Sequence, residues 1–273
     1  MKALLVTPPL TQLNTPYPAT CHLLGFLHSR NQNAEQMDLG IELIGRLFTG
    51  TMLKRIFEAA SQHSRLSKAN RIILQQADFY IRTIDPVMRF LGGKDATLAQ
   101  RLCELTLWPE SKRLPSNEDL ERGFGLIGNY DRATHLCTLF LKDLCDFINS
   151  TIDPHFELIR YAESLCLRLP EFRPLQNELQ KPHTLIDTLM LDIFSQCMAL
   201  CKPDLVGFSV PFPGNLYSAL RCAQWIRQNF PKVKIVMGGG YVNTELRSLT
   251  DPALFDFIDY LVFDDGELPL LRI

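Results

Sequence analysis

The sequence predicts an α/β protein in which a five-stranded, doubly wound parallel sheet carries a large all-helical insertion between its second and third strands. Three observations lead to this prediction. Short apolar runs are each followed by turn residues, helical patterns separate successive runs, and a long middle region has helical periodicity almost throughout. Strands that alternate with crossover helices are typical of βαβ units and of a parallel sheet.

The predicted strands are short and apolar, and they cover residues 2–6, 34–39, 204–210, 234–239 and 260–263. A helix is predicted over residues 18–29 and another over residues 215–230, because apolar residues recur every three to four positions along each. The order of these elements is Rossmann-like, of the kind found in flavodoxin-type folds.

Residues 46–201 form the helical insertion. Their apolar residues recur with helical spacing, and proline or glycine breaks divide them into roughly six to eight helices. A crossover between parallel strands needs only about a dozen residues, so this block exceeds any ordinary connection. The predicted domains are therefore residues 1–45 plus 202–273 for the sheet, and residues 46–201 for the insertion.

Composition excludes several classes of protein. Lys and Arg number 28 against 30 Asp and Glu, which argues against a dedicated nucleic-acid binder. No apolar run approaches the ~18 residues of a membrane span, and the N-terminus lacks a signal peptide. We therefore expect a cytoplasmic protein with no membrane partner, whose eight cysteines are reduced core residues. The last residues, GELPLLRI, are the beginning of a predicted helix, and the sequence ends within its first turns. A domain seldom ends there, so we expect a fragment of a longer protein.

The residues at the strand ends point to a ligand. In an open parallel sheet, ligands bind at the carboxyl ends of the strands. The five exits are small, polar or glycine-containing, and they read Thr7-Pro8-Pro9, Asp38-Leu39-Gly40, Ser209-Val210-Pro211, Gly238-Gly239-Gly240 and Asp264-Asp265-Gly266-Glu267. Neither a Gly-x-Gly-x-x-Gly fingerprint nor a phosphate-binding Gly-x-x-x-x-Gly-Lys motif occurs. This edge suits a large flat or phosphate-bearing ligand other than a dinucleotide.

The motifs at these exits resemble those of a known family. The segments "LLVTPPL", "PDLVGFSVPF", "AQWIRQNFPKVKIVMGGG" and "IDYLVFDDGELPLL" are similar, in this order and spacing, to the cobalamin-binding domain of B12-dependent radical SAM proteins. The resemblance covers residues 1–45 and 202–273. It implies that the nucleotide tail of cobalamin threads between the helices and the ligand edge of the sheet.

The resemblance also implies which residues bind the cofactor. Ser209 would hydrogen-bond the tail, Val210 and Phe212 would line its channel, and glycine at the fourth exit would leave room for it. The implied set is Thr7, Pro8, Leu10, Thr11, Gln12, Ser209, Val210, Pro211, Phe212, Gly238, Gly239, Gly240, Tyr241, Asp264 and Gly266. Simpler interpretations stay open: Ser209 as a helix cap or turn serine, the glycines as a strand-to-helix turn, and the acidic exit as a cap for the next helix.

One departure from the family concerns the cobalt. Family members that place a histidine on the metal carry Asp-x-His-x-x-Gly, whereas this chain has Thr20-Cys21-His22-Leu23-Leu24-Gly25. A histidine ligand needs an acceptor that fixes its tautomer, and threonine is a weak one. The prolines before residue 19 start a helix that contains His22. We therefore expect His22 on that helix, with no protein histidine on cobalt, and His22 as an axial cobalt ligand is the alternative.

The catalytic half of the family is missing from the sequence. No Cys-x-x-x-Cys-x-x-Cys motif occurs, and Cys197 and Cys201 lie on one helical face as core residues. The resemblance implies that S-adenosylmethionine and a [4Fe-4S] cluster belong to a downstream radical SAM domain of the same polypeptide. Cobalamin would then act as a methyl carrier or radical partner, and this chain would not be catalytic alone. The insertion would cap the corrin or dock another domain.

Two alternatives remain. In the first, the chain is a degenerate Rossmann-like domain that no longer binds cobalamin and serves protein interaction or domain docking. The fold allows this because a fold does not determine a function. Otherwise it is a small flavodoxin-like enzyme, which would require an acid/base pair or a nucleophile at the strand exits.

Overall fold

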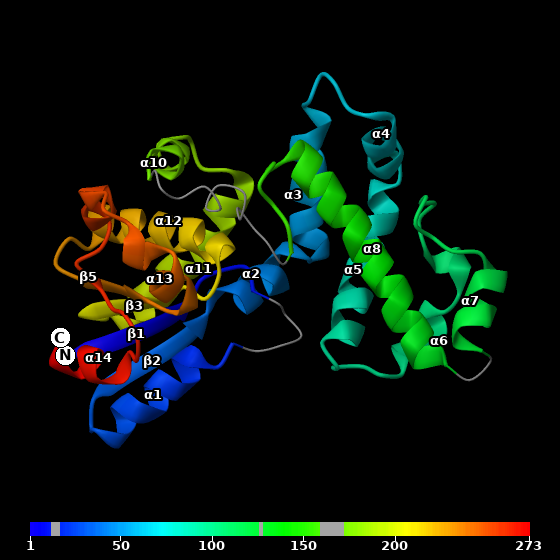
Figure 1. Ribbon diagram of the computed structural model, residues 1–273. Coiled ribbons are helices and arrows are strands. Elements are labelled where there is room, and N and C mark those ends of the chain that lie inside the picture. Colours follow the sequence, from blue (N-terminus) through cyan, green and yellow to red (C-terminus); the bar gives the residue numbers. More distant parts are fainter. Residues whose placement is uncertain (12–16, 126–127, 159–171) are drawn as a thin grey trace. The chain divides into compact units, whose positions relative to one another are not determined.

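The computed structural model describes residues 1–11, 17–125, 128–158 and 172–273 (Figure 1). It contains a five-stranded sheet in the order β2-β1-β3-β4-β5, and every pairing is parallel. The strands are β1 (Lys2–Thr7), β2 (Asn33–Asp38), β3 (Leu205–Ser209), β4 (Lys234–Gly238) and β5 (Tyr260–Leu261). The predicted α/β fold, with its parallel sheet and the helical segment between β2 and β3, is confirmed.

The chain forms two compact units, residues 1–43 with 155–273, and residues 44–154. We call the first the sheet unit and the second the helical unit. The predicted boundary at residue 201 differs from this division, because α11 (Leu185–Cys201) packs against α12 (Pro213–Asn229) of the sheet unit. The ring centroids of Phe194 in α11 and Phe208 in β3 lie 6.2 Å apart. The helix before β3 therefore covers the sheet.

Helices flank both faces of the sheet (Figure 1). One face carries α1 (Ala19–Ser29) and α14 (Glu267–Arg272), and the opposite face carries α11 and α12. The remaining elements of the sheet unit are α10 (Arg173–Leu179), α13 (Gly240–Thr244), η2 (Leu246–Ser248) and η3 (Pro252–Asp256). Helix α2 (Leu39–Leu47) follows β2 directly and crosses the boundary between the units.

The helical unit has its own aromatic core. Its elements are α3 (Gly50–Ser61), α4 (Lys68–Gln75), α5 (Ala77–Leu91), α6 (Leu98–Leu102), η1 (Leu105–Leu107), α7 (Asn117–Phe124) and α8 (Asn129–Thr151). Tyr80 of α5 stacks on Phe140 of α8 with 5.0 Å between ring centroids, and Phe57 of α3 lies 5.2 Å from Phe147. Within the described ranges, no helix is both long and apolar enough to cross a membrane.

Candidate functional site

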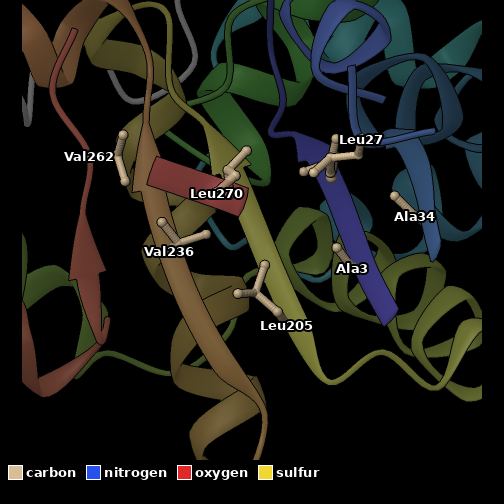
Figure 2. Close-up of a cluster of buried hydrophobic side chains, with 8 residues drawn as sticks. Ala3, Leu27, Ala34, Leu205, Val236, Val262 and Leu270 are labelled. Atoms are coloured by element: carbon tan, nitrogen blue, oxygen red, sulfur yellow. The ribbon is translucent and has the colours of Figure 1, made fainter. Parts of the chain in front are cut away.

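The side chains on the α1/α14 face change in size along the strands. Near the start of the strands this face is filled, since Ala3 and Leu205 belong to one hydrophobic cluster with Leu27 of α1 and Leu270 of α14 (Figure 2). Side chains alternate between faces along a strand, so the next positions on the same face of β3 are Gly207 and Ser209, and the next on β4 is Gly238. These small residues leave the upper part of the face unfilled.

A cavity of about 190 Å³ occupies this space between the sheet and the two helices. Its residues come from four strand ends and from both covering helices. They are Leu5, Ala19, Thr20, His22, Leu23, Gly207, Phe208, Ser209, Val236, Gly238, Gly239, Val262, Asp264, Asp265, Gly266, Glu267 and Leu270. Leu5, Val236, Val262 and Leu270 also belong to the hydrophobic cluster, so the cavity lies directly on the core.

Gly207 keeps the floor of the cavity open. A Cβ at this position would lie 3.1 Å from Leu5 Cδ2 and 3.4 Å from Val236 Cγ1. Sequence reasoning did not include Gly207 in the site, although a glycine inside a strand often marks the close approach of a ligand or another chain segment. Leu23 and Leu270, two further lining residues that it missed, are ordinary apolar positions of helices and carry no signal of their own.

Ser209 is the predicted polar side chain that is buried at the cavity, whereas Asp264, the other predicted polar residue of the lining, is exposed and pairs with Arg247. Ser209 is the last residue of β3 and is 6% exposed. Within the described part of the chain its hydroxyl makes no hydrogen bond, whereas the neighbouring Thr20 hydroxyl is paired with Thr7 at 3.3 Å. The N-cap of α12 is Phe212, so Ser209 does not cap that helix. The Ser209 hydroxyl is therefore available to a ligand.

The three glycines of the fourth exit have separate structural roles. Gly238 and Gly239 line the cavity. Gly239 has a φ of 114°, and a Cβ there would lie 2.6 Å from the carbonyl oxygen of Val210. A Cβ on Gly240 would lie 3.1 Å from the carbonyl oxygen of Pro211. The β3–α12 loop therefore requires small residues at Gly239 and Gly240, independently of any ligand.

Several predicted residues build this edge without lining the cavity. Val210 is buried, donates its N–H to Gly238 O at 2.7 Å and accepts from Tyr241 N at 3.1 Å. Pro8 O accepts a 2.7 Å hydrogen bond from Asn215 Nδ2. Of the predicted set, those that lie outside the cavity lining are Thr7, Pro8, Leu10, Thr11, Val210, Pro211, Phe212, Gly240 and Tyr241. Gln12 lies outside the described residues.

Phe212 differs from its neighbours because it is 53% exposed. Its ring meets Tyr17 edge to face, with 6.2 Å between centroids. Leu10 and Thr11, which follow β1, are buried. The carboxyl edge of the sheet thus presents an aromatic pair beside the exits of β1 and β3.

His22 lies on α1, as the proline pattern predicts, and its side chain is 72% exposed. Its Nε2 is 2.9 Å from Glu267 Oε1 at the start of α14, so this pair links the two helices that cover the cavity. Asp264 has a φ of 62°, donates its N–H to Asn243 Oδ1 at 2.6 Å and pairs its carboxylate with Arg247. The acidic exit therefore fixes the loop before α14, with its charges at the rim of an apolar cavity.

Among the described residues there is no group of three or more His, Cys, Asp or Glu that could hold a metal ion. Cys197 and Cys201 lie four residues apart on α11. Comparison with protein-family models, with curated proteins and with solved structures gives no significant match. The geometry of the cavity and the sequence pattern are thus the grounds for a functional proposal.

Proposed function

We propose that the sheet unit is a cobalamin-binding module of a B12-dependent radical SAM enzyme. The observation that carries this proposal is the cavity of about 190 Å³ between the sheet and helices α1 and α14, at the carboxyl ends of the strands. Ser209, Gly238 and Gly239, three residues of the family-like motifs, line it. Ser209 and Gly238 leave room for a ligand group at this point, whereas Gly239 is already required by the β3–α12 loop.

The size of the cavity matches only one part of the cofactor. A cavity of about 150 Å³ holds a benzene molecule, so one of about 190 Å³ that is partly open suits a fused two-ring base. The much larger corrin would lie outside, at the strand exits. Phe212 supplies exposed apolar surface there, and Leu10 and Thr11 belong to the same edge. The bulkier corrin therefore meets the loops while the nucleotide tail enters the fold.

The proposal leaves cobalt without a protein histidine. His22 is held on α1 by Glu267, and the Thr20 hydroxyl, at the position of the family's aspartate, is paired with Thr7. A metal-binding histidine is normally oriented by a second acceptor on its other ring nitrogen. The residue at the position of the family's aspartate therefore does not orient His22, whose Nε2 is held instead by Glu267 of α14.

The chemistry in this proposal belongs to the cofactors. Cobalamin supplies a methyl carrier or radical partner, while S-adenosylmethionine and a [4Fe-4S] cluster bind in a downstream radical SAM domain of the same polypeptide. The residues of the sheet unit bind the tail and exclude water from it. The unit alone is then a binding module without catalytic residues.

A direct binding measurement tests the proposal. The purified chain is mixed with an excess of hydroxocobalamin, free cofactor is removed by gel filtration, and the visible spectrum of the protein peak is recorded. Retained colour in stoichiometric amount is the expected result. A colourless peak would contradict cobalamin binding and would favour a Rossmann-like domain that serves protein interaction or domain docking.

A further inference from the structure

We infer that helix α14 is a movable lid over the cavity, held shut by the pair that His22 of α1 forms with Glu267 of α14. The cavity lies beneath these two helices, so a bulky ligand group enters when α14 turns away from α1. The inference rests on the proposed function for the ligand that passes the lid. The motion of α14 itself is measurable in the protein alone.

Helix α14 is attached to the rest of the sheet unit by few side chains. It has six residues, and Leu270 is the buried one among them. Leu270 lines the cavity and belongs to the hydrophobic cluster, on which the partly buried Ile273 also packs. Elements with few buried apolar contacts open at the lowest free-energy cost in a folded protein. On this ground α14 is the part of the cavity wall that moves most easily.

The segment before α14 combines a fixed point with a flexible one. Asp264 is fixed, because its N–H donates to Asn243 Oδ1 at 2.6 Å and its carboxylate pairs with Arg247. Two residues later comes Gly266, and glycine has the least restricted backbone of all residues. A Cβ on Gly266 would lie 3.3 Å from Leu23 Cδ2, so the closed lid begins in close contact with α1. Rotation at Gly266 therefore moves α14 while the loop before it stays in place.

The His22–Glu267 pair lies at the mouth of the cavity. His22 Nε2 is 2.9 Å from Glu267 Oε1, and both residues belong to the cavity lining. Their side chains are 72% and 25% exposed, which places the pair on the solvent side, as are the exposed lining residues Asp264 and Asp265. An exposed pair contributes little free energy, so it holds a lightly attached helix shut and still breaks readily.

Hydrogen exchange tests the lid without any ligand. The exchange rates of the amides in residues 267–273, relative to their rates in an unfolded chain, are measured by mass spectrometry in the wild type, His22→Ala, Glu267→Ala and the double variant. We expect exchange about two- to fivefold faster in each single variant, the factor that loss of an exposed ion pair produces. The double variant should exchange no faster than the single ones, because both remove the same contact. Unchanged exchange in His22→Ala, or additive effects in the double variant, would overturn the inference.

His28→Ala is the matched control for this experiment. His28 also lies on α1, but its Nε2 is 2.9 Å from Ala34 O and so links α1 to β2 instead of α14. Exchange in α14 should keep its wild-type rate in this variant. An acceleration equal to that in His22→Ala would show a general loosening of α1 and would contradict a specific role for the His22–Glu267 pair.

Stopped-flow absorption then tests whether the lid controls entry. A pair that closes over the empty and the occupied cavity slows entry and exit equally. In His22→Ala the association and dissociation rates of hydroxocobalamin should therefore both rise about two- to fivefold, with an unchanged dissociation constant. The rates for cobinamide, the corrinoid without the nucleotide tail, should stay the same. Wild-type rates for hydroxocobalamin in His22→Ala would overturn control of entry. If no corrinoid binds, the proposed function fails, and hydrogen exchange still decides whether α14 is a lid.

Discussion

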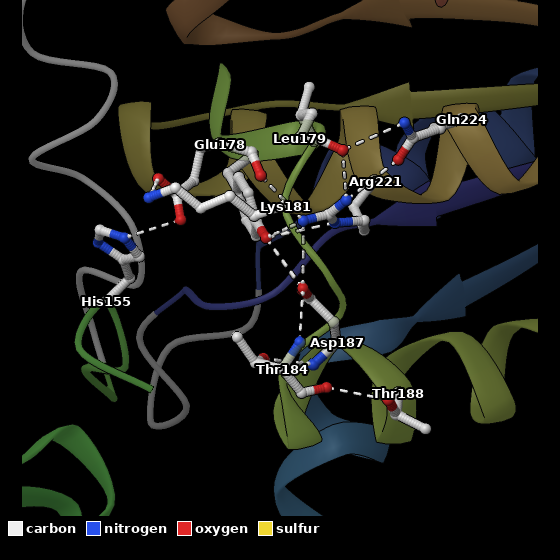
Figure 3. A network of polar contacts seen from close by, with 10 residues as sticks. His155, Glu178, Leu179, Lys181, Thr184, Asp187, Thr188, Arg221 and Gln224 are labelled. Carbon is white, nitrogen blue, oxygen red and sulfur yellow. Dashed lines mark hydrogen bonds and ion pairs between the residues drawn. The ribbon is translucent and has the colours of Figure 1, made fainter. Parts of the chain in front are cut away.

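Arg221 and Asp187 form an ion pair between α12 and α11 in which both side chains are almost completely shielded from solvent. Arg221 Nη2 lies 3.3 Å from Asp187 Oδ2, and the side chains are 2% and 0% exposed (Figure 3). The Tyr217 hydroxyl joins the two, since it donates to Asp187 Oδ2 at 3.0 Å and accepts from Arg221 Nη2 at 2.7 Å. A buried charge pair persists only when additional hydrogen bonds compensate its lost hydration.

Those additional bonds link a third helix. Arg221 Nη1 donates to Leu179 O, the last residue of α10, at 2.7 Å. Asp187 also completes a capping box with Thr184 at the start of α11. Arg221 thus hydrogen-bonds a free carbonyl at the end of α10, and Asp187 hydrogen-bonds a backbone N–H at the start of α11. The pair fixes α10, α11 and α12 to one another, which is why α11 belongs to the sheet unit.

Removing the arginine should destabilise the sheet unit strongly. In Arg221→Met the carboxylate of Asp187 stays buried without its counter-charge, so we expect the free energy of unfolding to fall by about 3–5 kcal/mol. Urea denaturation followed by circular dichroism measures this loss. Arg272→Met, at an exposed position of α14, is the control and should change the value by about 0.5 kcal/mol or less. Equal effects of the two variants would contradict a structural role for the pair.

A side chain at Gly239 should also be costly. Alanine there would have to adopt a φ of 114° and place its Cβ 2.6 Å from Val210 O, so Gly239→Ala should lose about 1–3 kcal/mol of stability. Gly25→Ala, in the middle of α1 with no atom within 4 Å of its Cβ, should instead gain about 0.5–1 kcal/mol. Thermal denaturation of both variants compares them. A stable Gly239→Ala protein would show that the β3–α12 loop can move away.

A larger side chain in the cavity should weaken binding of cobalamin, which carries the nucleotide tail, and leave binding of a corrinoid without that tail unchanged. Gly207→Val places methyl groups where a Cβ already lies 3.1 Å from Leu5 Cδ2, so the space for a base is reduced. We expect the dissociation constant for hydroxocobalamin to rise about tenfold or more, while that for cobinamide stays the same. Visible absorption titrations give both constants, and circular dichroism verifies that the variant is folded. A proportional rise for both ligands would contradict a tail in this cavity.

Replacement of His22 should leave the cobalt environment unchanged. Because His22 Nε2 is engaged by Glu267 at 2.9 Å on the surface of α1, we expect His22→Ala to bind hydroxocobalamin with the wild-type visible spectrum. The variant is compared with the wild type at equal occupancy. A shift of the absorption bands in the variant would place this histidine on cobalt and contradict the cofactor arrangement proposed above.

The helical unit should lose stability in alkali because of a buried thiol. Burial raises the pKa of Cys137 from its ordinary 9.0 to about 12. Above pH 9 the unfolded chain releases this proton while the folded chain keeps it. The resulting stabilisation is complete below pH 9 and is lost as the pH rises toward about 12.

Two variants isolate this contribution. Cys137→Ala should show a smaller decline of unfolding free energy between pH 9 and 11 than the wild type. Leu136→Ala removes a neighbouring buried side chain without removing a titratable group, so it should be less stable at every pH but keep the wild-type slope. Urea titrations across this range supply the slopes, and identical slopes in the wild type and Cys137→Ala would refute the effect.

The strands were predictable because each is a short apolar run with turn residues after it. The predicted and observed bounds differ by one residue at most, except that β5 (Tyr260–Leu261) ends two residues earlier than predicted. The helices between the apolar runs predicted parallel strands, because a crossover helix lets the next strand run in the same direction as the one before it. The boundary between the sheet unit and the helical unit was harder to predict. The apolar period of α11 is the same as in the inserted helices, and only its contact with α12 and Phe208 distinguishes it.

The candidate site was predictable only in part. Ser209, Gly238 and Gly239 stand at strand exits, where the sequence itself draws attention to small and polar residues. Gly207 was visible as a glycine within a strand, but whether it faced a ligand or a packed helix depended on its face of the sheet. The pairing of His22 with Glu267 joins residues 245 positions apart, and no local pattern indicates it.

The sequence by itself determined the α/β class, the five strands, and the small residues at their carboxyl ends. Periodicity is a property of one element, and it states which side chains share a face. The tertiary structure decided which element each face meets. It brought Leu23 and Leu270 over Gly207 to close a cavity, held His22 against Glu267, and buried Arg221 beside Asp187. These relationships depend on how separate helices pack on one sheet. Contacts between residues that are far apart in the sequence produce no periodic pattern of residues, so the sequence does not indicate them.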